Sequence, residues 1–224
     1  NPDNDQWNFR HIFGTNTQFD HHYNTPRVWF AQHYFNPVAA ASQTPESSEM
    51  PFIRKPERKI AVEDIQYILK SHYNETKYDP LGDGNEHDRK VYRAISLSRT
   101  AQSHILQMRN NVDSKHAAVQ WIEMGVPSFN AYVPFFANAD DTDVSYRELP
   151  KKMDLKSAFW LNEALAMVVE AHYSEFNQAD LDFQKELGEW CRRKIHEVDE
   201  HAKKLAGKQL TTYLTGQSHE IASH

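Results

Sequence analysis

The chain has 224 residues, of which 39% are hydrophobic, 12% aromatic and 25% charged, and its formal net charge is −6. This aromatic content predicts a packed core and excludes a disordered chain. The acidic balance argues against a nucleic-acid partner, and the lack of any apolar run near 18 residues argues against a membrane span. The single cysteine excludes an internal disulfide and favours a cytoplasmic protein.

The first part of the chain, residues 1–60, shows no helical periodicity. Its aromatic residues are scattered among Asn, Asp, Thr, His and Pro, so we expect irregular chain that covers a core and buries its rings there. From Val62 onward the apolar residues follow helical spacing, with acidic residues at the start, and the helix is expected to end near Tyr73.

The middle of the chain predicts strands. Short apolar or alternating runs of strand length occupy residues 91–99, 104–109, 117–124 and 131–137. Residues 110–115 have the composition of a hairpin loop, which predicts antiparallel pairing. Because the runs do not alternate cleanly, both faces of the sheet are expected to be covered.

The last part of the chain predicts three helices. The first starts with Asp154 as N-cap and runs to His172 or Tyr173, with apolar residues around most of its circumference, so we expect it to be buried on most sides. The second follows Asn177 and ends at Gly207, and the third starts after it. We expect one domain over residues 1–224, in three regions: irregular (1–60), mixed helix and strand (61–153) and helical (154–224).

Cysteine and histidine offer no catalytic or metal site by spacing. Cys191 lies on the apolar stripe of a predicted helix, where burial raises the thiol pKa, so we interpret it as structural. A zinc-protease helix needs two His four residues apart, whereas His196 and His201 are five apart. A metal-dependent hydrolase is therefore an alternative with little support, and we expect no metal and no cofactor.

Four separated segments carry the functional information. They read YNTPRVW (23–29), SLSRTAQSHILQMR (96–109), YVPFFAN (132–138, followed by an Asp-Thr loop) and AFWLN (158–162). In this order they resemble the bacterial dipeptidase A family, which are cysteine peptidases of the N-terminal-nucleophile (Ntn) hydrolase class. The resemblance implies an α+β fold, with the antiparallel strands forming part of an αββα sandwich and a helical region following them.

The resemblance also implies a mechanism. In Ntn hydrolases the first residue, here expected to be Cys, attacks the amide with its thiol while its own α-amino group takes the proton. Asn1 cannot do this, and family members are about twice as long. The resemblance therefore implies that this chain is the C-terminal portion of a dipeptidase, inactive alone, with the N-terminal half and a dipeptide as its partners.

Within the chain, Arg99 is the first candidate for a supporting catalytic residue, because a guanidinium lowers a thiol pKa or binds a peptide carboxylate. The alternative is a surface or ion-paired arginine. Asn24, Arg27 and His104 are further candidates for substrate binding. Asn24 could instead build a turn, Arg27 could anchor its loop to a carboxylate, and His104 could be a hydrogen-bonded core residue.

A severed half should expose a sheet edge or an apolar patch and pair with itself, so a homo-oligomer is expected. The rival hypothesis is a non-catalytic protein-interaction module whose helical tail packs against a partner. Such a module should be monodisperse and should unfold cooperatively on its own.

Overall fold

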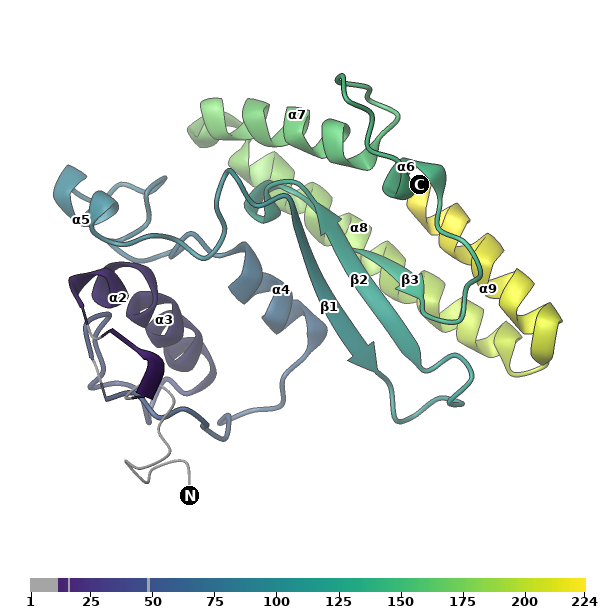
Figure 1. Ribbon diagram of the computed structural model, residues 1–224, viewed down its shortest axis with the longest axis horizontal. Coiled ribbons are helices and arrows are strands. Elements are labelled where there is room, and N and C mark those ends of the chain that lie inside the picture. Colours follow the sequence, from purple (N-terminus) through teal and green to yellow (C-terminus); the bar gives the residue numbers. More distant parts are fainter. Residues whose placement is uncertain (1–11, 16, 48) are drawn as a thin grey trace. The chain divides into compact units, whose positions relative to one another are not determined.

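The structure is a computed structural model, and it describes residues 12–15, 17–47 and 49–224. The chain divides into two compact units, Asn1–Ile95 and Ser96–His224. The first contains helices and long connections, whereas the second contains the sheet and the longest helices (Figure 1). The α+β class predicted from the sequence is confirmed.

Two helices, α2 (Gln18–Tyr23) and α3 (Thr25–Phe35), occupy a region expected to be irregular, so that prediction is wrong for these residues. The apolar residues of α3 are not gathered on one face, which is why no helical period is visible. A proline in its first turn fits the helix start, where its missing N–H needs no partner.

Aromatic rings form the core of the first unit. Phe30 is buried, with Tyr67 stacked 6.1 Å and Tyr73 edge-on 5.6 Å from its ring centre. The expected burial of rings therefore holds for Phe30, whereas Phe13 and Phe19 are exposed. Offset and edge-on pairs of this kind contribute beyond their buried area.

The helix α4 (Val62–Lys70) confirms the prediction from Val62, although it ends three residues before Tyr73. A short helix, α5 (Glu86–Val91), and irregular chain occupy the region 91–99, where a strand was expected, so that prediction is wrong. The carbonyl of Arg93 accepts a hydrogen bond from the hydroxyl of Tyr73, and that of Ala94 accepts one from Nε of Arg27. These side chains take the place of the neighbouring strand that the carbonyls would bind in a sheet.

The second unit contains a three-stranded antiparallel sheet in the order β1-β2-β3 (Figure 1). Its strands are β1 (Gln102–Met108), β2 (Ala118–Met124) and β3 (Val133–Phe136), with a short 3-10 turn η2 (Pro127–Phe129) before β3. These strands and the hairpin loop between the first two confirm the predictions over 104–137. Gly125, at φ +95°, makes the left-handed bend after β2.

The two faces of the sheet differ in burial. On β2 the side chains of Val119, Trp121 and Glu123 are buried, and the helices α8 (Tyr173–Ala202) and α9 (Gly207–Ala222) pack against the sheet. On the opposite face of β1, Leu106 is 73% and Met108 71% exposed. The expectation that both faces are covered is therefore wrong for β1, because side chains alternate between the faces and, within the described second unit, helices pack on only one of them.

The helical region contains α6 (Val144–Arg147), α7 (Ala158–Ala171), α8 (Tyr173–Ala202) and α9 (Gly207–Ala222). The three predicted helices are confirmed with shifted bounds. Ser157, and not Asp154, is the first N-cap, the break falls at His172, and Gly207 starts α9. Gly207 has φ +53°, a conformation that glycine adopts at little cost.

The expected burial of the first of these helices is wrong. On α7, Leu161 is 50%, Met167 68% and Val168 53% exposed. Its apolar residues surround the helix, and only part of that surface lies against other elements of the second unit. Among the described helices, none has the length and apolar character needed to cross a membrane.

Candidate functional site

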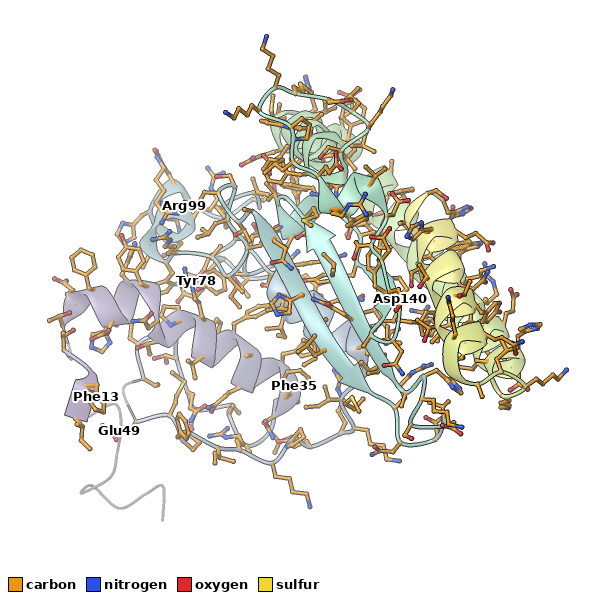
Figure 2. All side chains as sticks on the ribbon, turned by 45° about the vertical axis from the view of Figure 1, so that its right-hand side comes forward. Phe13, Phe35, Glu49, Tyr78, Arg99 and Asp140 are labelled. Carbon is orange, nitrogen blue, oxygen red and sulfur yellow. The ribbon has the colours of Figure 1, made fainter. Side chains whose placement is uncertain are left out.

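Arg99 lies on an exposed turn that precedes β1 (Figure 2). The turn is closed by a hydrogen bond of 2.9 Å from the amide of Thr100 to the carbonyl of Leu97. Within the described part of the chain, the guanidinium forms no ion pair, so it stays available to an anionic ligand. This exposed position fits both the predicted role and the alternative of a surface arginine, so Arg99 stays a prediction. The ion-paired alternative finds no support among the described residues.

His104 is exposed on β1, on the same face as Leu106 and Met108. Its Nδ1 lies 3.3 Å from Nε2 of Gln102, two residues earlier on the strand. The alternative of a core histidine is therefore wrong. Arg99 and His104 both lie near the start of β1, so the second unit brings these two candidates to one end of the sheet.

The other two candidates, Asn24 and Arg27, lie in the first unit and have structural contacts. Asn24 precedes α3, and its Nδ2 donates a hydrogen bond of 2.9 Å to Oδ1 of Asp20. Arg27 donates from Nε to the carbonyl oxygen of Ala94 at 3.1 Å. The contact of Asn24 fits the alternative of a turn residue. The contact of Arg27 fits the alternative of a loop anchor, although Arg27 binds a carbonyl and not a carboxylate.

Cys191 is buried in α8, as predicted, and is a structural residue. Burial raises the pKa of its thiol to about 12, so almost no thiolate exists at neutral pH. Among the described residues there is also no group of three or more His, Cys, Asp or Glu placed to hold a metal ion.

A buried histidine–aspartate pair, His72 and Asp79, was missed by sequence analysis. Nδ1 of His72 lies 2.7 Å from Oδ1 of Asp79, and its Nε2 lies 3.1 Å from Nδ2 of Asn74. Because both ring nitrogens have partners inside the fold, this imidazole has no free nitrogen for a substrate. It holds a segment in which Tyr73 and Glu75 have positive φ values of 68° and 63°.

The sequence of this chain matches a known protein family. The model of peptidase family C69 matches residues 1–186, which is most of the chain. The chain belongs to peptidase family C69. Its resemblance to bacterial dipeptidases, carried by the four segments quoted above, is thereby confirmed at the level of the family.

Several curated proteins are similar to this chain along nearly all of its length. A probable dipeptidase of Latilactobacillus sakei is 60% identical over 224 residues, which are 100% of this chain and 46% of that protein. Dipeptidase A of Lactobacillus helveticus is 36% identical over 223 residues, covering 99% of this chain and 46% of that protein. Probable dipeptidase B of Lactococcus lactis is 38% identical, covering 96% and 45%. This chain thus spans about half the length of these relatives.

Proposed function

We propose that this chain is the C-terminal part of a cysteine-type Ntn dipeptidase whose nucleophile lies in the other part of the protein. The observation that carries the proposal is the 60% identity along all 224 residues to a probable dipeptidase of which they form only 46%. A cytoplasmic location stays a prediction that rests on the single cysteine.

The open face of the sheet supports this proposal. β1 is an edge strand of the three-stranded sheet, and its outer face carries the exposed side chains of Leu106 and Met108. A second sheet packed on this face would bury them, as in an αββα sandwich. The helices α8 and α9 would then form one outer layer.

The proposed reaction is hydrolysis of a dipeptide amide. The thiol of an N-terminal Cys in the other part gives its proton to the free α-amino group and attacks the carbonyl carbon. Hydrogen-bond donors stabilise the oxyanion, and the C–N bond breaks as the α-ammonium group returns its proton to the leaving amine, which releases one amino acid. Water then hydrolyses the thioester, which releases the other amino acid and restores the thiol. The exposed guanidinium of Arg99 would bind the carboxylate of the dipeptide or lower the thiol pKa.

The test is hydrolysis of dipeptides by this chain, with and without the complementary N-terminal part that begins with Cys. We expect activity only in the mixture, and Arg99→Ala should lower it about tenfold or more, because a charge-assisted hydrogen bond contributes about 1.5–3 kcal/mol. Arg147→Ala, which removes another exposed arginine, is the matched control. Activity of this chain alone would contradict the proposal.

The rival hypothesis, a non-catalytic interaction module, is favoured by one observation, the exposed apolar side chains of α7. It predicts a monodisperse chain that unfolds cooperatively and stays inactive after mixing. Sedimentation velocity and urea unfolding of this chain alone separate the two hypotheses, since a severed half should associate.

A further inference from the structure

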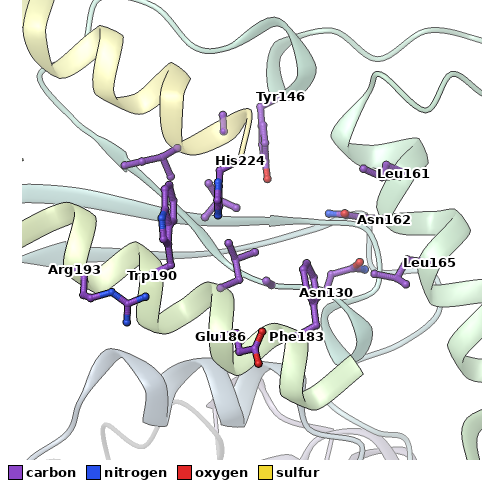
Figure 3. A pocket seen from close by; sticks show the side chains of 15 residues that line it. Asn130, Tyr146, Leu161, Asn162, Leu165, Phe183, Glu186, Trp190, Arg193 and His224 are labelled. Carbon is purple, nitrogen blue, oxygen red and sulfur yellow. The ribbon is translucent and has the colours of Figure 1, made fainter. Parts of the chain in front are cut away.

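A pocket of about 440 Å³ lies in the second unit, between α7, α8 and α9 (Figure 3). Its volume falls within the range of small-molecule sites, about 300–1,000 Å³. The walls are apolar and aromatic, and each of the three helices contributes to them. They include Leu161, Leu165, Phe183, Leu187, Trp190 and Ile221.

The hydroxyl of Tyr146 and the carboxamide of Asn162 point toward the middle of this pocket, where the ring of His224 also lies, stacked on Trp190 (Figure 3). Among the described residues, the Tyr146 hydroxyl has no hydrogen-bond partner. Burial raises its pKa, so it stays protonated and can donate to a ligand. Asn162 donates from Nδ2 to the carbonyl of Met124 at 2.8 Å, which leaves its oxygen as an acceptor.

Two opposite charges on α8, Glu186 and Arg193, also line the pocket. Both are exposed, and within the described ranges neither forms an ion pair. They are seven residues apart, which places their backbones about 10 Å apart along the helix axis, too far for a close pair without bending both side chains. A ligand with a cation at one end and an anion at the other would complement them.

We propose that this pocket binds a small unblocked peptide of two or three apolar residues. Its amino group lies toward Glu186, its carboxylate toward Arg193, and its backbone reaches Tyr146 and Asn162. An extended peptide advances about 3.3–3.6 Å per residue, which suits this spacing. Arg99 does not line this pocket, so the proposal is a second peptide site, separate from the site of hydrolysis. The choice of a peptide over another amphipathic zwitterion rests on the proposed function.

Calorimetric titration of this chain with leucyl-leucine, N-acetyl-leucyl-leucine and leucyl-leucine amide tests the proposal. We expect leucyl-leucine to saturate one site and each blocked peptide to bind about tenfold more weakly, because each lacks one charge-assisted contact. Glu186→Gln should weaken leucyl-leucine but not its acetylated form, and Arg193→Met should weaken leucyl-leucine but not its amide. Tyr146→Phe should weaken all three.

Glu197→Gln and Arg192→Met, two exposed charges of α8 outside the pocket, are the controls and should leave binding unchanged. Equal affinity for the three peptides, or no saturable binding at millimolar peptide, would overturn the proposal.

Binding by the chain alone needs no nucleophile. Binding without hydrolysis in the mixture therefore counts against the proposed function only, and hydrolysis without binding counts against the pocket only.

Discussion

Arg109, at the end of β1, and Asp199, in α8, form an ion pair between positions 90 residues apart in the chain. Nη1 of Arg109 lies 2.6 Å from Oδ2 of Asp199, and Nη2 lies 3.1 Å from Oδ1. The side chains are only 10% and 8% exposed. Arg109 also donates from Nε to the carbonyl of Ala117 at 3.1 Å, so one guanidinium joins the hairpin to the helix behind it.

Removing this arginine should destabilise the second unit. Arg109→Met removes both hydrogen bonds of the buried Asp199 carboxylate to the guanidinium and leaves Nε2 of His116 3.7 Å away, so we expect a loss of about 3 kcal/mol in the free energy of unfolding, measured with urea. Arg147→Met removes an exposed ion pair with Asp141 and should cost less than about 1 kcal/mol. Equal losses for the two variants would show that burial of the Arg109–Asp199 pair is unimportant.

The thiol of Cys191 should be inert in the folded chain. With a pKa raised to about 12 by burial, it should react with Ellman's reagent only as the protein unfolds. The native chain should therefore label slowly, and the chain in denaturant should label at once with one equivalent. Rapid labelling of the native chain at pH 8 would contradict the structural role.

Asp64 should make the first unit sensitive to acid. Its carboxylate binds Arg58 at 2.8 Å and accepts the amide of Ala61 at 2.7 Å, and the bond to Arg58 is the main cause that lowers its pKa to about 2. Because the folded pKa is below the unfolded value of about 3.9, the stabilisation is complete above pH 4 and is lost toward pH 2.

Asp64→Asn should therefore lower the free energy of unfolding at pH 7, by about 1 kcal/mol. It should also flatten the dependence of stability on pH between 4 and 2, measured by urea midpoints. Asp83→Asn, at an exposed carboxylate, is the control and should change neither quantity. An unchanged slope in Asp64→Asn would mean that other carboxylates cause the acid sensitivity.

The open face of β1 should drive self-association of the isolated chain. We expect the sedimentation coefficient to rise with protein concentration, because exposed apolar side chains on an edge strand favour pairing with another copy. Leu106→Lys should reduce this association and should also weaken reconstitution with the N-terminal part. Val38→Lys, at a side chain 80% exposed in the first unit, should do neither. A sedimentation coefficient that stays at the monomer value at all protein concentrations would contradict this prediction.

Local patterns accounted for much of the secondary structure. The strands after residue 102, their antiparallel pairing and the three late helices follow from apolar spacing and hairpin composition. The helix α3 could not be predicted from the sequence, because the apolar residues of α3 are spread around the helix and show no helical period. Arg99 and His104 could be named from the resemblance, but their exposure could not.

By itself, the sequence determined the α+β class, the family resemblance and the structural role of Cys191, because each depends on neighbouring residues or on a local period. Only the tertiary structure decided that the outer face of β1 and much of α7 are uncovered, that His104 is exposed, and that Arg109 binds Asp199. Burial and ion pairing depend on which distant segments meet, and no spacing along one strand or helix specifies its partner.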